Sequence, residues 1–357
     1  MHREPASNHD LKRIGLFLLS GAFLLLVALT ARWLSPPSGL RAEAAAATTA
    51  AETASGKTVL AAAQVVFEGM GKGEKKRALF PFASEERTDW HFIPRSRKGV
   101  ALAQLFPDKQ EKVLALLRAS LSARGFEKAE QVRSLEGILR GIEGEGRRFA
   151  RDPFLYHVSF FGEPSDTEAW GWRFEGHHLA LNFTLQGNKL VSATPAFFGA
   201  NPGTVRGGPQ DGLRVLGGAE DLARKLVQAL DAKERSECLG SEVPDEVPDT
   251  QKARYSGPFP AGIPASKLDA EEKKLLRQLL LEYRRDLTAD APVSIASEDP
   301  SLEGVHFAWG GSIQAGEGHS YLIHGPGFVI NYANTQNDAN HVHASLRERE
   351  RDFGGSR

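Results

Sequence analysis

The chain has one cysteine among its 357 residues, Cys238, and so has little thiol chemistry to offer. A single cysteine forms no disulfide within the chain and supplies neither a cysteine-rich zinc site nor an iron–sulfur cluster. Any metal bound by this protein must therefore be held by histidine and carboxylate side chains.

The sequence also lacks an excess of charge of either sign. Its 44 Lys and Arg residues balance 45 Asp and Glu residues, which leaves a formal net charge of −1. This balance argues against a nucleic-acid partner that is bound through bulk positive charge. With 41% hydrophobic and 25% charged residues, the composition is that of an ordinary globular protein and not of a disordered or multi-span membrane chain.

Several well-known catalytic motifs are missing. The chain has no G-x-S-x-G elbow, no P-loop, no G-x-G-x-x-G placed between a strand and a helix, and no H-E-x-x-H helix. Cys238 has no nearby partner of the kind that activates a nucleophile. Papain-like chemistry is therefore not expected.

One long apolar run is present near the N-terminus. Residues 14–31 carry no charge and follow Lys12 and Arg13. As a helix this run would span roughly 27 Å, close to the ~30 Å hydrocarbon core of a membrane. Basic residues before an apolar run keep that side in the cytoplasm, so we expect residues 1–35 to be a transmembrane anchor or a signal peptide. The rest of the chain would then be membrane-anchored or exported, in the periplasm or outside the cell.

The segment after the apolar run is poor in large apolar residues. Residues 36–56 are rich in Ala and Thr, which predicts a linker, and Ala42 with Ala44 offers a cleavage site of the A-x-A type. Residues 57–354 are long enough for a substantial core, and we expect them to form a single α+β domain.

Helical periodicity marks five segments of this domain. Apolar residues recur at helical spacing in residues 57–70, 108–124, 127–142, 219–232 and from 269 onward. Asp108 with Glu111 and Asp269 with Glu272 resemble capping boxes at helix starts. Gly125 is expected to end the second of these helices.

Strand-like runs are rich in aromatic and β-branched residues and are bounded by Gly, Pro or Asn. They are residues 155–162, 169–185, 189–196, 306–310, 319–324, 328–332 and 340–346. Gly187 and Asn188 suit a two-residue hairpin turn, and five prolines between residues 240 and 264 suggest an exposed loop. Helices and strands that occur in separate blocks indicate an α+β fold, with packed helices and a largely antiparallel sheet.

Histidines provide the most specific chemical signal. In Asn340-His341-Val342-His343 two histidines stand two residues apart in a predicted strand, so both imidazoles would project from one face. A rigid strand that presents two neutral imidazoles suits a divalent metal such as zinc or copper. Hydrogen-bonded histidines of the core or surface are the alternative interpretation.

A second histidine pair could complete the site. His177 and His178 follow Glu175 and Gly176, and adjacent strand residues face opposite ways, so only one of the two would normally reach a shared metal. A bulge at Gly176 would change which one does so, and a regular strand slightly favours His178. Glu175 is a candidate ligand, orienting group or general base, and otherwise a partner of an arginine.

Two further residues are candidates for catalysis. Tyr321 shares a strand face with His319 and could donate a proton, although a core aromatic residue has the same pattern. Arg347 and Asp352 follow the H-x-H strand, and Arg347 could clamp an anionic substrate, although a structural ion pair is the more common explanation.

Longer stretches of the sequence resemble an uncharacterised bacterial family, the domain of unknown function 3500 family. The stretches that carry the resemblance are WHFIP (90–94), GWRFEGHHLALNF (171–183), TPAFFGANPG (194–203), HFAWGG (306–311) and GHSYLIHGPGFVINYANTQNDANHVHASLRERERDFG (318–354). The resemblance implies a single domain, often exported, and brings no activity with it. It also implies that two acidic residues usual in the family are replaced here by Asn331 and Ala333.

Two functions follow from these patterns. The first is a metal-dependent hydrolase or oxidase whose ion is held by His341, His343 and His178 or His177. The second is a non-catalytic module of the cell envelope that binds a carbohydrate or another small molecule, with Trp172, Trp309, Tyr321 and residues 334–340 around a pocket. A purely structural envelope protein is a weaker third alternative.

Overall fold

The computed structural model describes residues 56–144, 146, 148–239 and 242–355. The predicted leader, residues 1–35, and all of the predicted linker except residue 56 therefore lie outside the described residues. Within the described ranges, no helix is both long enough and apolar enough to cross a membrane.

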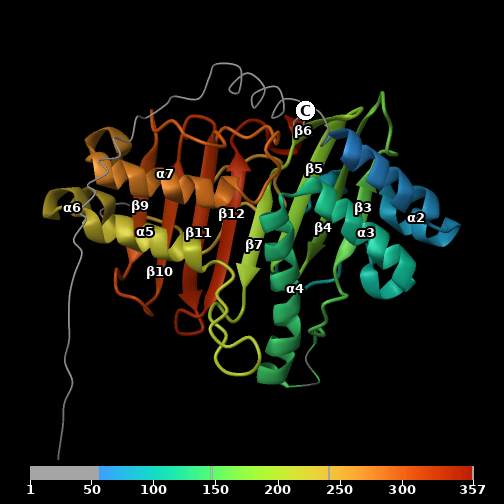
Figure 1. The fold of residues 1–357 in the computed structure, drawn as a ribbon, viewed down its shortest axis with the longest axis horizontal. Coiled ribbons are helices and arrows are strands. Elements are labelled where there is room, and N and C mark those ends of the chain that lie inside the picture. Colours follow the sequence, from blue (N-terminus) through green and yellow to red (C-terminus); the bar gives the residue numbers. More distant parts are fainter. Residues whose placement is uncertain (1–55, 145, 147, 240–241, 356–357) are drawn as a thin grey trace, which may run out of the picture. The chain divides into compact units, whose positions relative to one another are not determined.

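In the described part of the chain, 12 strands form one sheet (Figure 1). Its order is β1-β3-β4-β5-β7-β12-β11-β10-β9-β8, with β2 also paired to β3 and β6 to β5. Among the described strands, β1 and β3 run parallel and the other pairs are antiparallel. The strands are β1 (Leu79–Phe80), β2 (Val100–Ala101), β3 (His157–Phe161), β4 (Ala169–Gly176), β5 (Leu179–Gln186), β6 (Lys189–Ser192), β7 (Ala196–Ala200), β8 (Ile263–Pro264), β9 (His306–Gly311), β10 (His319–His324), β11 (Phe328–Gln336) and β12 (His341–Glu348). The prediction of a mixed α+β fold with a mostly antiparallel sheet is confirmed.

Helices α2, α3, α4, α5 and α7 lie over one face of this sheet (Figure 1). The helices are residues 56–69, α2 (Lys72–Ala78), α3 (Pro107–Ser120), α4 (Ala123–Glu143), α5 (Gly217–Ala229), α6 (Ala232–Leu239) and α7 (Ala270–Arg284). Buried residues of these helices and of the strands beneath them form the main hydrophobic core. We call the covered side of the sheet the helix face.

The opposite side, the loop face, is covered by irregular chain. Trp90 and Phe92 from one loop and Val247 from another pack there against Phe197 of β7. The rings of Phe92 and Phe197 stack with centroids 4.0 Å apart. The loop predicted between residues 240 and 264 is thus not simply exposed, because it buries Val247 and Tyr255 against the sheet.

The helix boundaries follow local chemistry, with two corrections. Asp269 caps α7, accepting a hydrogen bond from the backbone of Glu272 while the Glu272 side chain returns one, as predicted. The capping box predicted at Asp108 is wrong, because α3 begins one residue earlier with Pro107 in its first turn. Gly125 does not end a helix but lies inside α4, where an added Cβ would lie 1.9 Å from the carbonyl oxygen of Asp286.

Strand prediction was wrong at two boundaries. The run from 169 to 185 is a hairpin, β4 and β5, and not one strand. The run from 189 to 196 ends as β6 at Ser192, and Ala196 already belongs to β7. The turn predicted at Gly187-Asn188 is confirmed, because Gln186 pairs with Lys189. Helices α2 and α6 were not predicted.

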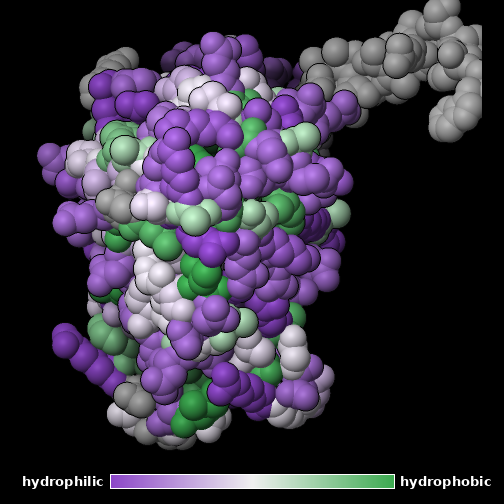
Figure 2. All heavy atoms as spheres, turned by 90° about the vertical axis from the view of Figure 1, so that its left-hand side faces the viewer, coloured by the Kyte–Doolittle hydropathy of each residue, from purple (hydrophilic) through white to green (hydrophobic). Residues whose placement is uncertain are grey.

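The edge that carries α6 and β9 presents a mainly hydrophilic surface. Figure 2 looks at this side and shows small apolar patches separated by hydrophilic side chains. The sheet joins its two halves at β7 and β12, so residues near 200 and near 345 lie side by side (Figure 1). The candidate site lies at this seam.

Candidate metal centre

Three histidines from two distant segments converge on the loop face. His178 Nε2 lies 2.8 Å from His341 Nε2 and 3.2 Å from His343 Nε2. The three candidate ligand nitrogens all lie within 4.8 Å of one another. Two nitrogens bound to one tetrahedral zinc ion at about 2.0 Å would be roughly 3.3 Å apart, so the spacing suits shared coordination.

Strand geometry presents two of these ligands together. His341 and His343 alternate with Val342 along β12, and Val342 packs into the core on the helix face. The H-x-H prediction of two imidazoles on one face, with a valine behind them, is confirmed. His343 is 4% exposed, whereas His341 is half-buried, so the site reaches solvent on the side of His341.

Small neighbours make room around His343. Its direct cross-strand partners are Ala333 on β11 and Gly199 on β7. A Cβ added to Gly199 would lie 3.0 Å from His178 Cδ2 and 3.1 Å from His178 Cβ. The absence of a side chain at position 199 therefore allows the ring of His178 to lie over β7, next to His343.

His178 reaches the site from a turn and not from a strand. His177 and His178 are the two residues that join β4 to β5, where Gly176 pairs with Leu179. His178 has φ 60, in the left-handed region that few residues other than glycine and asparagine adopt. The expectation that the pair lies in a strand is wrong, and the alternative of a bulge at Gly176 is not found, because the pairing of β4 with β5 is regular up to Gly176 and Leu179.

Backbone hydrogen bonds hold this turn in place. The His178 N–H donates to the Phe92 carbonyl at 2.9 Å, and the His178 carbonyl accepts from the Gly199 N–H at 2.8 Å. The Tyr156 hydroxyl donates to the His177 carbonyl at 2.8 Å. Gly176 is required here, because an added Cβ would lie 2.4 Å from the Tyr156 ring.

A carboxylate orients one of the three imidazoles. Glu246 lies with its oxygens 2.7 and 2.8 Å from His343 Nδ1. A carboxylate only accepts, so His343 Nδ1 carries the proton and Nε2 presents its lone pair to the site. Gln336 Nε2 donates to Glu246 at 2.9 Å and fixes the carboxylate. Metal-binding histidines commonly have such a partner.

The environment favours neutral rings. Burial lowers the pKa of His178 well below its usual value, and the neighbouring His177, His343 and His341 lower it further. Burial, together with His343, lowers the pKa of His341 to about 3. Neutral imidazoles have the lone pairs that a metal needs. One proton shared between His178 and His341 would satisfy that pair as an N–H···N hydrogen bond, whereas a cation between the rings would satisfy all three nitrogens.

His177 is not part of the three-histidine cluster. Its ring stacks on that of His178 with centroids 3.7 Å apart, and its Nδ1 lies 2.6 Å from Glu136 Oε1 on α4. Of the two alternatives for the third ligand, the structure therefore places His178 in the cluster. His177 lies behind it as a packing neighbour.

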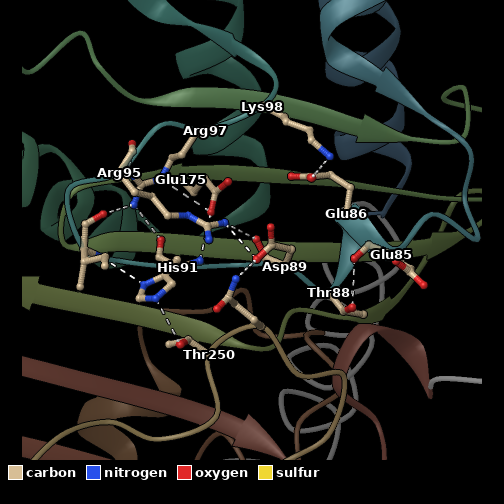
Figure 3. Close-up of polar contacts among 12 residues, drawn as sticks. Glu85, Glu86, Thr88, Asp89, His91, Arg95, Arg97, Lys98, Glu175 and Thr250 are labelled. Carbon is tan, nitrogen blue, oxygen red and sulfur yellow. Dashed lines mark hydrogen bonds and ion pairs between the residues drawn. The ribbon is translucent and has the colours of Figure 1, made fainter.

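Glu175 lies in an ion network away from the three converging nitrogens. Its carboxylate is 3.0 Å from Arg173 Nη2 and 3.9 Å from Arg97 Nε, and it accepts from the His91 N–H at 3.3 Å. Figure 3 shows Glu175 gathered with His91, Arg95 and Arg97 in one polar cluster. The arrangement is that of an arginine partner, and among the described residues no metal-binding group includes Glu175.

Tyr321 and Arg347 also lie outside the cluster. Tyr321 faces the helices, fully buried, with its hydroxyl 2.5 Å from that of Tyr283. Arg347 shares the loop face with His343 but has no exposed surface, and it pairs with Asp352 at 2.6 Å. Neither side chain is placed to meet a substrate at the histidine cluster.

The aromatic pocket of the alternative hypothesis is not formed. Trp172, Trp309 and Tyr321 are all at most 1% exposed and belong to the main core. Trp309 and Tyr321 stack within that core with centroids 6.1 Å apart. These residues therefore line no open binding site.

Sequence reasoning missed Glu246 and Gly199. Glu246 lies in a proline-rich loop whose path over the sheet has no local signature. Gly199 lies in TPAFFGANPG, where a glycine inside a strand could have indicated the close approach of another group. The local sequence around Glu246 or Gly199 does not predict a contact with a histidine that is more than 20 positions away.

The comparisons with known proteins fit this picture. A family model described as "Protein of unknown function (DUF3500)" matches residues 52–355. The chain belongs to this family. No curated protein and no solved structure matches the chain. The resemblance seen in the sequence is thereby confirmed, and the family description supplies no activity.

The two positions that the sequence resemblance singled out, Asn331 and Ala333, lie on β11 opposite β12. Ala333 is the cross-strand partner of His343, and Asn331 is that of Ser345, two residues along β12. A carboxylate at position 333 would stand beside His343 on the loop face. The neighbour at this position is a methyl group, so the cluster consists of three imidazoles.

Proposed function

We propose that this protein is a metal-dependent hydrolase whose divalent ion, zinc by preference, is held by His178, His341 and His343. The observation that carries the proposal is the convergence of three imidazole Nε2 atoms from two distant segments. Three histidines with no fourth protein ligand among the described residues are typical of catalytic zinc sites, which keep a position open for water.

Each residue of the site has a separate task. His341 and His343 are fixed by β12, and His178 closes the cluster from the β4–β5 turn. Glu246 holds the Nδ1 proton of His343 and thereby keeps its Nε2 free. A bound zinc ion supplies a water molecule with a pKa lowered toward 7, which is a nucleophile for hydrolysis.

Zinc and copper both accept imidazole ligands, so the metal is a separate question from the site. Zinc is preferred because the cluster offers nitrogen ligands alone and an open position, which is sufficient for hydrolysis without a change of redox state. Copper would instead support oxidation. A protein that purifies with copper and does not hydrolyse esters would favour the oxidase.

We also propose that the protein acts outside the cytoplasm, anchored or released after export. The support is the uncharged run at residues 14–31 behind Lys12 and Arg13.

The test is hydrolysis by the purified full-length chain. We expect cleavage of at least one member of a panel of 4-nitrophenyl carboxylic and phosphoric esters. A chelator should abolish this activity, zinc should restore it, and His343→Ala should lower it at least 100-fold. His324→Ala is the matched control, because His324 is a half-buried strand histidine outside the cluster whose Nε2 lies 3.0 Å from the Pro260 carbonyl.

Two outcomes would contradict the proposal. If His343→Ala and His324→Ala retained equal activity, hydrolysis would not arise at the cluster. If the wild type bound zinc at the cluster but cleaved no ester in the panel, the metal site would be supported and the proposal of a hydrolase would be contradicted.

A further inference from the structure

A cavity of about 300 Å³ is lined by His177, whose ring stacks on His178, and by none of the three histidines of the candidate metal centre. Its walls come from the loop after Trp90, from α4, from residues 149–157 and from the β4–β5 turn. Among the lining residues are Arg95, Arg97, Glu136, Arg151, His157 and His177. Its volume is at the lower end of the range for small-molecule sites.

Two of the lining arginines have N–H groups without an acceptor. The Nε atoms of Arg95 and Arg97 are both buried and have no hydrogen-bond partner among the described residues. The side chain of Arg97 is 3% exposed, and its Nε is 3.9 Å from Glu175, too far for a hydrogen bond. Buried guanidinium groups normally find acceptors for their protons, so these donors leave capacity for a ligand.

Arg151 adds a third donor with no acceptor. Its Nε and Nη2 donate to Glu143, whereas its Nη1 lies 3.4 Å from His177 Nδ1. That nitrogen already donates its proton to Glu136 at 2.6 Å, because a carboxylate only accepts. Nη1 of Arg151 therefore faces an N–H group and makes no hydrogen bond there.

The acidic residues that line the cavity, Glu136 and Asp152, do not accept hydrogen bonds from these arginine N–H groups. Glu136 is occupied by His177, and Asp152 accepts from the Phe154 N–H at 2.8 Å. Asp89 and Glu175, which partner Arg95 and Arg97, are not part of the cavity wall. Three guanidinium groups thus surround a small cavity with donors that the protein leaves without acceptors.

We propose that this cavity binds a small molecule through an oxyanion, a carboxylate or phosphate group. Planar guanidinium groups are suited to such groups, because they donate two parallel hydrogen bonds to two oxygens. The ligand would lie against His177, whose ring stacks on His178. This inference concerns a second site and does not depend on the proposed hydrolysis.

The experiment is titration calorimetry of the full-length protein with sodium phosphate and with sodium malonate, in a chloride buffer of constant ionic strength. The wild type should bind at least one of them saturably. Arg95→Met and Arg151→Met should each weaken that binding at least 10-fold. Lys98→Met is the matched control, because Lys98 follows Arg97 but is 67% exposed and pairs with Glu86.

The metal must be ruled out as the anion's partner. We therefore expect His341→Ala combined with His343→Ala to keep the same anion affinity, because neither residue lines the cavity. Loss of anion binding in this variant would place the anion on the metal and overturn the proposal. So would the absence of saturable binding of both anions, or unchanged affinity in correctly folded Arg95→Met protein. If Arg95→Met lowers the thermal midpoint of the protein, Arg95→Lys is tested in its place. Arg95→Lys should also bind the anion more weakly than the wild type does.

Discussion

The carboxylate of Glu246 decides which nitrogen of His343 is available. Its Oε1 accepts the hydrogen bond from His343 Nδ1, with 2.7 Å between the two atoms. Its other oxygen accepts a hydrogen bond from Gln336 Nε2 at 2.9 Å, which fixes the carboxylate. Partners of this kind typically account for 10–100-fold in metal affinity. We expect Glu246→Ala to weaken zinc binding by about that factor, measured by competition with a chromogenic chelator. Glu242→Ala, an exposed change in the same loop, should have no effect.

An unchanged affinity in Glu246→Ala would mean that the contact is incidental. The Glu246→Ala substitution leaves the three histidine ligands in place, so the stoichiometry at saturating zinc should stay at one ion per chain. The two quantities must therefore be measured separately.

The left-handed backbone conformation of His178 could not be predicted from the sequence. Periodicity treats residues 169–185 as one strand, because both arms are rich in aromatic and apolar residues. Only the pairing of Gly176 with Leu179 reveals a hairpin. The H-x-H pair was predictable because strand alternation alone fixes it. The third ligand depends on tertiary packing.

At the scale of elements, β7 provides the space for the site. A Cβ at Gly199 would be 3.0 Å from both the His178 ring and the Val342 carbonyl, closer than most real contacts. We expect Gly199→Ala to displace His178 and to weaken zinc binding at least 10-fold while the protein still folds. The measurement is the same chelator competition, accompanied by circular dichroism.

The matched control is Gly137→Ala in α4, where an added Cβ meets nothing within 4 Å. This variant should keep its metal affinity and gain a little helix stability, since alanine is the better helix former. If Gly199→Ala also bound zinc normally, the close approach of β7 would not matter for the site.

The fold was predictable where elements carry their own signals. The α7 capping box at Asp269 and Glu272 and the Gly187-Asn188 turn lie within short segments, and both are present. Errors arose where a distant contact decides the outcome, as at Gly125, which has no side chain because Asp286 approaches it. The contact of Glu246 with His343 was not predicted for the same reason, because it also joins residues that are far apart in the sequence.

At the scale of the whole molecule, buried histidines make stability depend on pH. Burial and nearby arginines lower the pKa values of His91 and His157 from 6.5 to about 4. Between these values the unfolded chain binds more protons than the folded one, so the free energy of unfolding falls as pH decreases. Well above pH 6.5 both states are unprotonated at these two residues, and the residues then contribute no slope.

We expect the urea midpoint to fall between about pH 6.5 and pH 4. His157→Gln, which cannot be protonated in this range, should show a shallower fall. An identical slope in this variant would mean that His157 has a normal pKa in the folded protein.

The N-terminal run makes a second prediction at this scale. In a bacterial host, the full-length chain should be accessible to protease added to spheroplasts, and deletion of residues 14–31 should protect it inside the cell. Equal protection of both proteins would contradict export. Comparison of gel mobility in membrane and soluble fractions then distinguishes an anchor from a removed signal peptide.

The most direct test of the central claim is anomalous diffraction from crystals grown with zinc. The account predicts one strong peak at the zinc edge, about 2.0–2.1 Å from the Nε2 atoms of His178, His341 and His343. It also predicts that this peak is absent from crystals of the His341→Ala and His343→Ala double variant. Wild-type crystals soaked in zinc that show no peak between these three rings would contradict it.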